Sequence, residues 1–306
     1  MHYAVYGLTI ESAFPLGTLP LADETRADIR ILHTAPDTFA GLESSATETT
    51  WYRRKPLADG SVYLGIPDVL QAVISADGRI ARCAPAPNGD PRSFEANLLT
   101  FVLTGALTLQ GEEPLHATVV RVGDHAIGFL GDSGAGKSTL AAFLLAEGAE
   151  LVTDDMLRIA YSTGEAMAYR GPPRLKLFDA EARRLLPAAI RNAAFNPTSG
   201  KLLVETASLH DDRVPLSALF WLGEAAPVGA PVMVRRVQGI EAIRILLAAT
   251  LHLDHRPPER TGRQLQALER LAKGVPLFAL GYERRHDLLR SVADAVHHHA
   301  RCRLRS

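Results

Sequence analysis

Hydrophobic residues recur with different spacings in the two parts of the chain. Up to about Cys83, short runs rich in β-branched and aromatic residues lie between turn-forming residues. This pattern predicts strands over residues 3–10, 28–32, 61–64 and 71–83. Asp77-Gly78 lies between two apolar runs inside the last of these segments and predicts a tight hairpin. The N-terminal part is therefore expected to be rich in β-structure.

A proline-rich segment follows this part. Pro85, Pro87 and Pro91 surround Asn88-Gly89, and such a cluster of turn-forming residues is typical of a linker. We therefore predict a β-rich N-terminal domain over residues 1–91 and a second domain over residues 92–306.

The second part mixes helical and strand patterns. Residues 94–110 carry apolar side chains at helical spacing and end at Gly111. Strands are then predicted over residues 117–122, 125–130, 151–152, 202–204, 216–221, 232–237 and 277–280. Helices are predicted over residues 139–146, 240–251, 263–273 and 287–297. This alternation favours an α/β fold after about residue 115.

Composition adds limits on class and partners. The chain has 306 residues, of which 47% are hydrophobic, so a large core is expected. A formal net charge of −1 provides no field that attracts nucleic acid or an anionic membrane, and neither partner is expected. Cys83 and Cys302 fit no metal-binding spacing, and the first residues lack a signal-peptide profile, which favours a cytoplasmic protein. The sequence does not indicate an oligomeric state.

Residues 131–138 match every fixed position of the phosphate-binding pattern G-x-x-x-x-G-K-S/T. They follow a predicted strand and precede a predicted helix, which is the context that this pattern requires. The glycines let backbone N–H groups converge on phosphate oxygens, Lys137 can reach the outer phosphates, and the Ser138 hydroxyl is an expected Mg²⁺ ligand. We expect ATP to be bound by the residues of this loop and by the residue that follows it. These residues are Gly131, Asp132, Ser133, Gly134, Ala135, Gly136, Lys137, Ser138 and Thr139.

Two carboxylates follow the next predicted strand. Asp154 and Asp155 come directly after residues 151–153, a short distance beyond the phosphate-binding loop. One carboxylate at such a strand end can bind Mg²⁺, and the other can accept a proton from an attacking hydroxyl. The alternative is a polar turn that closes the strand. His116 precedes the strand before the loop, and a lone histidine at such a position is more often structural than catalytic.

Taken together, His116, the loop 131–138 and the strand ending in Asp154-Asp155 resemble the catalytic core of HPr kinase/phosphorylase. The resemblance covers about residues 112–160 and is loose over the rest of the C-terminal part. It implies a P-loop serine kinase with a fold related to phosphoenolpyruvate carboxykinase. It also implies that His116 assists catalysis, that Asp154 and Asp155 share the metal and base roles, and that Ser138 binds metal.

The chain also departs from that family. Thr139 stands where HPr kinases usually have Glu, and their second, glycine-rich signature for phosphorolysis is not recognisable. Residues 169–178 instead resemble the PRLKLW-type motif of HPr-kinase-like proteins linked to peptide natural products, including lasso-peptide precursor kinases. Arg174 and Lys176 in this segment alternate, so on a strand both face one side. That side meets either the terminal phosphate of ATP or solvent.

The sequence therefore predicts an ATP- and Mg²⁺-dependent kinase that phosphorylates a serine hydroxyl of a peptide or protein. The resemblance of residues 169–178 indicates a lasso-peptide precursor as the acceptor. Two alternatives remain open, a kinase for a small metabolite and a regulator that binds nucleotide without transferring phosphate. A phosphopeptide formed from labelled ATP would distinguish the first function from both alternatives.

Overall fold

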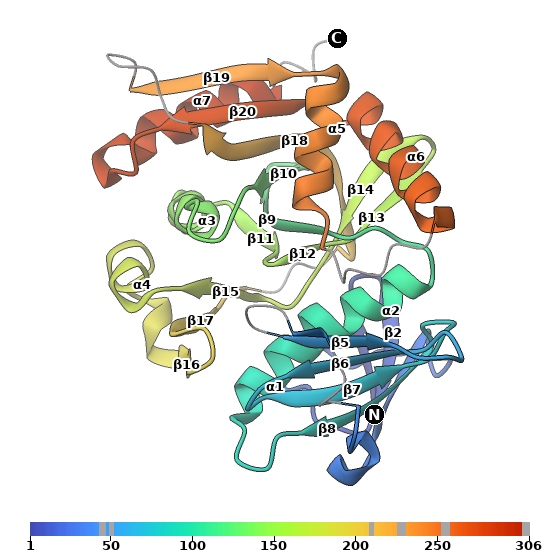
Figure 1. Ribbon diagram of the computed structural model, residues 1–306. Helices are drawn as coiled ribbons and strands as arrows, with labels where there is room; N and C mark the ends of the chain where they lie inside the picture. The colour runs from blue at the N-terminus through green and yellow to red at the C-terminus, as the bar shows by residue number, and fades with distance from the viewer. Residues whose placement is uncertain (43–46, 49–51, 208–210, 225–230, 252–257, 302–306) are drawn as a thin grey trace.

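The computed structural model describes residues 1–42, 47–48, 52–207, 211–224, 231–251 and 258–301. It is a mixed α/β structure that contains an N-terminal sheet covered by one long helical segment and a second, larger sheet flanked by helices (Figure 1). Cys302 lies outside the described residues, whereas Cys83 is buried in the N-terminal core. Among the described residues, no helix combines the length and the apolar character that a bilayer span requires.

The N-terminal sheet contains eight strands in the order β1-β2-β3-β8-β7-β6-β5-β4. The β2–β3 and β3–β8 pairs are parallel, and the other pairs are antiparallel. The strands are β1 (His2–Val5), β2 (Leu8–Ser12), β3 (Ile29–His33), β4 (Thr47–Glu48), β5 (Arg53–Pro56), β6 (Val62–Ile66), β7 (Leu70–Ile74) and β8 (Ile80–Pro85), and the short 3₁₀ helix η1 (Pro36–Phe39) follows β3. The predicted β-rich character of this region is confirmed.

Two local predictions in this sheet have different outcomes. The turn at Asp77-Gly78 is confirmed, because it joins β7 to β8 and Gly78 has a φ of 67°. The single strand predicted over residues 3–10 is wrong, because a tight turn at Tyr6-Gly7 divides it into β1 and β2. Tyr6 has a φ of 56°, a conformation that is uncommon for a residue with a bulky side chain, so sequence propensity gave no signal for this turn.

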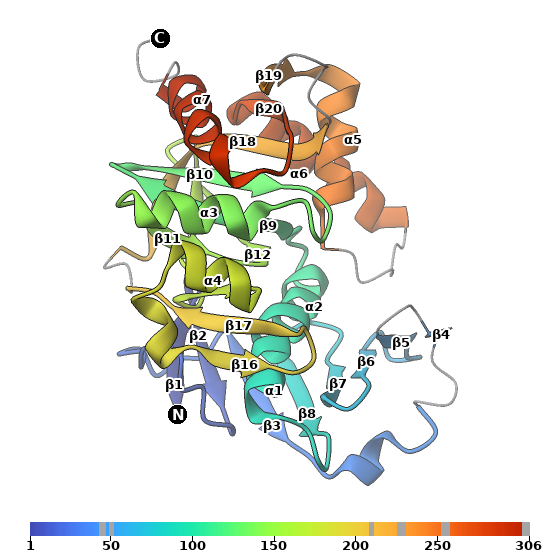
Figure 2. The same ribbon diagram turned by 90° about the vertical axis from the view of Figure 1, so that its left-hand side faces the viewer.

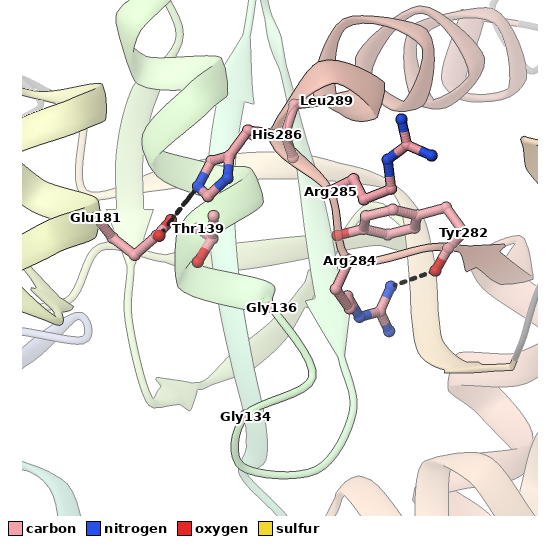
Figure 3. Close-up of a pocket in the computed structure, with 9 residues that line it drawn as sticks. All are labelled: Gly134, Gly136, Thr139, Glu181, Tyr282, Arg284, Arg285, His286 and Leu289. Carbon is pink, nitrogen blue, oxygen red and sulfur yellow. Dashed lines mark hydrogen bonds and ion pairs between the residues drawn. The ribbon is translucent and has the colours of Figure 1, made fainter.

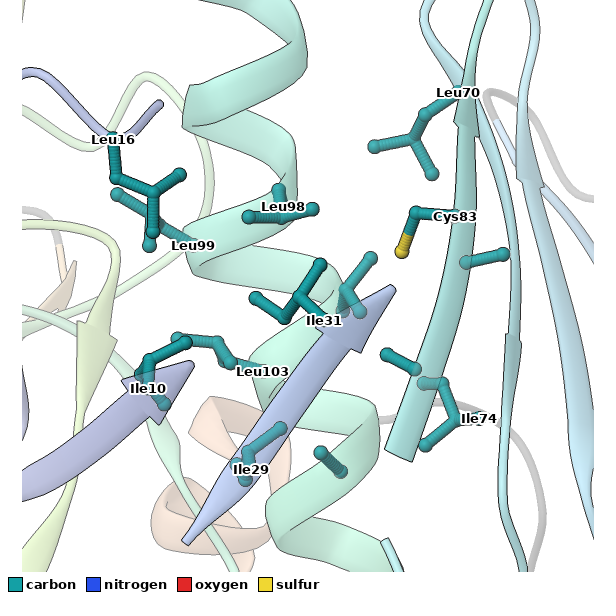
Figure 4. Close-up of a cluster of buried hydrophobic side chains, with 14 of the residues drawn as sticks. Ile10, Leu16, Ile29, Ile31, Leu70, Ile74, Cys83, Leu98, Leu99 and Leu103 are labelled. Atoms are coloured by element: carbon teal, nitrogen blue, oxygen red, sulfur yellow. The ribbon is translucent and has the colours of Figure 1, made fainter. Parts of the chain in front are cut away.

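A helical segment covers one face of the N-terminal sheet. It consists of α1 (Pro91–Asn97), the π-helical turn η2 (Leu98–Val102) and α2 (Leu103–Leu109), which confirms the helix predicted over residues 94–110. Asp90 caps its start by accepting hydrogen bonds from the backbone N–H groups of Arg92 and Ser93. Leu98, Leu99 and Leu103 are fully buried against strand residues such as Ile31 (Figure 4).

This packing concerns the predicted boundary between the two domains. The segment that follows the proline-rich linker packs mainly into the hydrophobic core of β1–β8, and this core also includes Met156 of β12 (Met156–Leu157), whose Sδ lies 3.1 Å from the Thr104 hydroxyl of α2. The helical spacing of apolar residues in 94–110 predicts which face of the helix is buried, but it does not predict which sheet that face packs against. The division into domains 1–91 and 92–306 remains a prediction.

The second sheet contains nine strands. Its main order is β11-β9-β10-β18-β14-β13, with β12 paired to β9, β20 paired to β18, and β19 paired to β20. The strands are β9 (Leu115–Val122), β10 (His125–Leu130), β11 (Glu150–Thr153), β12 (Met156–Leu157), β13 (Ile159–Ser162), β14 (Glu165–Tyr169), β18 (Arg213–Glu224), β19 (Val232–Val237) and β20 (Leu277–Tyr282). The β13–β14 hairpin, which turns at Thr163-Gly164, was not predicted.

Helices cover both faces of this sheet (Figures 1 and 2). On one face, α3 and α7 bury residues such as Leu140 and Val296 against Phe129 and Phe220. On the other, α5 and α6 bury Leu246 and Leu268 in a separate core. The helices are α3 (Lys137–Ala146), α4 (Asp179–Leu185), α5 (Gly239–Ala249), α6 (Pro258–Gly274) and α7 (Leu289–Arg301), with the 3₁₀ helices η3 (Ala189–Asn192) and η4 (His286–Leu288). The predicted α/β class is confirmed.

A small three-stranded sheet lies between the two larger ones. Its order is β15-β17-β16, and its strands are β15 (Arg174–Leu177), β16 (Ala194–Asn196) and β17 (Lys201–Glu205). Ser93 of α1 donates a hydrogen bond of 2.9 Å to the side-chain oxygen of Asn196. This sheet therefore connects the N-terminal helix to the region around α3 and α4.

Strand directions bring several strand ends to one edge of the nine-stranded sheet. β10 is parallel to β18, and β18 is parallel to β20. β9 is antiparallel to both β10 and β11, so β11 runs in the same direction as β10. The carboxyl ends of β10, β11, β18 and β20 therefore lie at the same edge as the start of β9. In α/β sheets, ligand sites lie at this kind of edge.

Candidate active site

The loop formed by residues 131–138 connects β10 to α3 at that edge. Gly131, Gly134 and Gly136 have φ values of 143°, 83° and 92°, which side-chain-bearing residues rarely adopt. A Cβ on Gly131 would lie 3.1 Å from the Cβ of Ala135, so the loop also closes tightly on itself. The glycines of the motif are thus required by the backbone path.

Lys137 begins α3 and turns its side chain back into the loop. Its Nζ donates hydrogen bonds of 2.7 Å to the Gly131 carbonyl and 3.0 Å to the Asp132 carbonyl. Burial lowers the pKa of Lys137, whereas the charges of Asp154 and Asp155 act in the opposite direction. The first-turn N–H groups of α3 and this ammonium group together favour an anion at the helix N-terminus.

Asp154 follows β11 and is buried, with 7% of the residue exposed. One carboxylate oxygen accepts a 2.7 Å hydrogen bond from the Thr118 hydroxyl, and the other accepts a 2.9 Å bond from the backbone N–H of Lys176. Burial, followed by the neighbouring charge of Asp155, raises the pKa of Asp154 above its usual value. The carboxyl group is therefore held in one orientation by a strand on each side.

Asp155 has a left-handed backbone conformation with a φ of 70°. Non-glycine residues in this conformation store backbone strain and concentrate at functional sites. Its carboxylate forms an ion pair with the Nζ of Lys176. Burial alone would raise the pKa of Asp155, but the charge of Lys176 and its hydrogen bond to the carboxylate outweigh burial, so the pKa lies below its usual value. Asp155 is therefore ionised at neutral pH.

His116 lies at the start of β9, opposite Met156 of β12. Burial lowers the pKa of His116 to about 4, and the positive charge of Lys137 acts in the same direction. The imidazole is consequently neutral at neutral pH, with one nitrogen able to donate and the other able to accept a hydrogen bond.

The structure brings most of the candidate residues to one cavity. His116, Lys137, Ser138, Asp154 and Asp155 come from three separate segments of the chain. The full lining consists of His116, Ser133, Gly134, Gly136, Lys137, Ser138, Thr139, Asp154, Asp155, Lys176, Leu177, Phe178, Glu181 and Lys201. Gly131, Asp132 and Ala135 belong to the same loop but are not among the residues that line this cavity.

Arg174 lies elsewhere. It is buried and forms a 3.2 Å ion pair with Glu95 of α1 and a 3.3 Å hydrogen bond with the Thr18 hydroxyl. Only Lys176 of the alternating pair lines the cavity. Residues two apart on a strand share a face but are separated by roughly 6.5 Å, so one can reach the site while the other reaches a neighbouring element. The structure thus gives Arg174 a contact with the N-terminal region rather than a place in the cavity.

Removing the Arg174 side chain should therefore reduce stability more than turnover. Arg174→Ala leaves the Glu95 carboxylate, whose side chain is only 13% exposed, without its cation, and losing one partner of a buried ion pair costs up to about 3–5 kcal/mol. We expect urea denaturation to show a loss of this size, whereas phosphotransfer per folded molecule should change less than about threefold.

Lys176→Ala provides the matched comparison, because it removes a cation of the same strand that lines the cavity. It should reduce turnover strongly, and it should reduce stability less than Arg174→Ala does, because the Lys176–Asp155 ion pair is more exposed than the Arg174–Glu95 pair. If the two variants exchanged these effects, the assignment of Arg174 to a packing role would be wrong.

Sequence reasoning missed Phe178, Glu181 and Lys201. The Lys201 Nζ lies 5.1 Å from the centre of the Phe178 ring, and Phe178 is 54% exposed beside the cavity. Lys201 begins β17, and only the antiparallel pairing of β17 with β15 carries it to the site. No local pattern marks such a residue, because its place depends on a strand pairing between distant segments.

Comparisons with known proteins give a distant structural similarity and no sequence match. Neither the family profiles nor the curated protein sequences match this chain. Among solved structures, the Hpr(Ser) kinase/phosphatase from Coxiella burnetii is similar, with 11% sequence identity and a TM-score of 0.35. The alignment covers 63% of this chain and 99% of that chain. The function therefore has to be argued from the residues of the site.

Proposed function

We propose that this chain is an ATP-dependent kinase that phosphorylates a serine hydroxyl of a peptide or protein. The observation that carries the proposal is the cavity in which Lys137 and Ser138 of the glycine loop meet Asp154 and Asp155 of a separate strand end. A loop for phosphate groups and a pair of carboxylates in one cavity are the components that phosphoryl transfer to a hydroxyl requires. The fold we propose is a P-loop kinase domain of the HPr kinase and phosphoenolpyruvate carboxykinase type.

The donor atoms fit a magnesium nucleotide. Mg²⁺ prefers oxygen ligands and is usually held by one or two carboxylates together with phosphate oxygens. Ser138 and one carboxylate of the Asp154–Asp155 pair would hold the ion here, which when bound neutralises charge on the phosphates. Asp155 is ionised at neutral pH, and Asp154 is oriented by two hydrogen bonds, so both side chains suit such a role.

Other residues of the cavity would bind the phosphates, accept the proton and position the acceptor. The loop N–H groups and Lys137 bind the phosphates, and Lys176 and Lys201 add positive charge to the cavity wall. The acceptor hydroxyl loses its proton to Asp154 or Asp155 as its oxygen bonds to the terminal phosphorus, and the bond from that phosphorus to ADP breaks. Neutral His116 can hydrogen-bond to the acceptor or to a phosphate oxygen in this cavity.

The acceptor class is part of the proposal. The exposed Phe178 ring and the half-buried Lys201 form an aromatic and cationic wall at the cavity, which suits the apolar and carbonyl groups of a peptide around its serine. A lasso-peptide precursor is the particular acceptor that the motif at residues 169–178 suggests.

Incubation with γ-labelled ATP, Mg²⁺ and an array of serine-containing peptides, including lasso-peptide precursors, tests this function. We expect phosphoserine in at least one peptide and none in the matching peptide with alanine at that position. Transfer only to small hydroxyl compounds would indicate a metabolite kinase. Tight Mg²⁺–ATP binding without transfer would indicate a nucleotide-dependent regulator. Either result would overturn the proposed activity.

The direction of the reaction is a separate prediction. The chain lacks a recognisable phosphorolysis signature, so the enzyme should run forward and dephosphorylate its product poorly. Phosphorylated product, Mg²⁺ and inorganic phosphate should yield pyrophosphate at less than about one hundredth of the forward rate. This estimate corresponds to ~2.7 kcal/mol of missing transition-state stabilisation, of the order of one lost contact to the reacting group. Rapid release of pyrophosphate would show a bifunctional enzyme.

A further inference from the structure

A second cavity adjoins the glycine loop on the side away from Asp154 and Asp155. Its volume is about 180 Å³, well above the ~10–15 Å³ that one water molecule needs. It lies between α4, the first turn of α3 and the segment joining β20 to α7 (Figure 3). Its lining consists of Gly134, Gly136, Thr139, Glu181, Tyr282, Arg284, Arg285, His286 and Leu289.

The two cavities lie next to each other at the loop and share part of their lining. Gly134, Gly136, Thr139 and Glu181 line both of them. Along the sheet edge, β11 with the two aspartates lies on one side of β10, and β18 and β20 lie on the other. A triphosphate in the loop with its terminal phosphate near the aspartates would therefore direct its other end toward β20. The second cavity occupies that position.

One wall of the second cavity carries a planar cation held in a fixed position. The Arg284 guanidinium lies 4.3 Å from the centre of the Tyr282 ring. It donates hydrogen bonds of 2.8 Å to the Leu222 carbonyl and 3.3 Å to the Tyr282 carbonyl. Guanidinium planes stack on aromatic systems, including nucleic-acid bases. Arg285 is instead engaged with Glu283 and Asp287, so it is the weaker candidate for this role.

The opposite wall carries a carboxylate that still has contact with solvent. Glu181 of α4 pairs with the His286 Nε2, which lies 3.0 Å from both carboxylate oxygens, and 22% of the Glu181 side chain is exposed. Figure 3 shows this pair across the cavity from Tyr282 and Arg284. Each carboxylate oxygen can accept more than one hydrogen bond, so Glu181 can also accept from vicinal hydroxyl groups.

We propose that this cavity binds the nucleoside of the triphosphate. The base stacks on the Arg284 guanidinium, and the ribose hydroxyls donate hydrogen bonds to Glu181. The inference rests on the proposed function in requiring that the loop bind a nucleoside triphosphate. It adds the residues that distinguish a nucleotide from an inorganic polyphosphate, and these residues lie outside the phosphate-binding motif.

Equilibrium binding of Mg²⁺–ATP and of magnesium tripolyphosphate tests the stacking contact. Arg284→Lys keeps the charge but loses the planar group, so it should weaken ATP binding by about tenfold, within the range for loss of one stacking contact. Its affinity for tripolyphosphate should stay within about twofold of the wild type, which also shows that the loop is intact. Arg183→Ala, an exposed arginine of α4 paired with Asp179, is the control and should change neither affinity.

The Glu181 contact is tested with ATP and 2′-deoxy-ATP. Wild-type protein should bind ATP about fivefold more tightly, because the deoxy compound lacks one donor to the carboxylate. Glu181→Ala, which has no acceptor at this position, should bind both compounds with nearly equal affinity, and its affinity for tripolyphosphate should not fall below that of the wild type. If the wild-type protein bound the two nucleotides with equal affinity, the proposed contact between Glu181 and the ribose would be wrong.

The outcomes separate this inference from the proposed function. Wild-type protein that binds tripolyphosphate as tightly as ATP would overturn the nucleoside site and leave the phosphate-binding loop in place. An Arg284→Lys variant that loses both ligands equally would assign Arg284 to the phosphates or to folding, and would also overturn the inference. Wild-type protein that binds neither ligand would overturn the proposed function itself.

Discussion

Lys137→Ala should reduce phosphotransfer by about 10²–10³-fold or more while leaving the fold intact. The backbone N–H groups of the loop and the α3 N-terminus remain, so the nucleotide can still bind. The variant lacks the ammonium group that meets the charge developing on the transferred phosphoryl group, and the loss of one such preorganised donor has an effect of this size. Single-turnover transfer from labelled ATP at saturating nucleotide measures the effect on the chemical step.

The structure also indicates why the fold should tolerate this change. Lys137 contributes two hydrogen bonds, to the carbonyls of Gly131 and Asp132, and its buried charge is costly to maintain, as its lowered pKa shows. Its loss should change the free energy of unfolding by no more than about 1–2 kcal/mol. Lys273→Ala, an exposed lysine of α6 paired with Glu269, is the matched control. Unchanged turnover in Lys137→Ala would exclude a P-loop kinase mechanism.

Asp154→Asn and Asp155→Asn should each reduce turnover by about 10²–10⁴-fold, the range for loss of a general base. Asn keeps the shape of the side chain but is a poor proton acceptor and a weaker ligand for a divalent cation. The two variants should differ in their dependence on Mg²⁺. The variant that lacks the metal ligand should recover part of its activity as Mg²⁺ increases, and the variant that lacks the base should not.

Each substitution has a structural consequence that must be measured alongside turnover. Asn at position 154 can keep only one of the two accepted hydrogen bonds, from Thr118 or from the Lys176 backbone, because its amide group replaces one carboxylate oxygen. Asn at position 155 leaves Lys176 without its ion pair. Thermal unfolding of both variants identifies any loss of fold. Asp179→Asn, at the exposed start of α4, should leave turnover unchanged. Near wild-type rates in both site variants would show that the two aspartates only form the polar turn at the end of β11 and take no part in catalysis.

Much of the local structure follows from the sequence. Apolar spacing identified most helices and strands after residue 115, and the glycine pattern identified the loop at 131–138, because both signals depend on residues that are close in the chain. The split of β1 from β2 at Tyr6-Gly7 was not predictable in this way. A bulky residue with positive φ contradicts its own conformational preference, so only the surrounding packing can hold it there.

The cavity could be predicted only in part. Lys137, Ser138 and the aspartates were identifiable because the chain itself places them at the ends of successive strands. Arg174 and Lys176 looked equivalent, since alternation on a strand puts both on one face. The contact with Glu95 separates them, and it joins residues 79 positions apart.

The sequence by itself determined the phosphate-binding loop, the α/β alternation and the acidic pair. Each of these features depends on a short run of residues that are close in the chain and favour one local backbone structure. Only the tertiary structure decided that the helix at 91–109 completes the N-terminal core, that Lys201 and Glu181 reach the cavity, and that Arg284 stacks on Tyr282 beside the loop. These arrangements depend on which distant strands pair and which helix faces meet. Many alternative pairings satisfy the same local pattern, and the folded chain selects among them through the packing of the whole core.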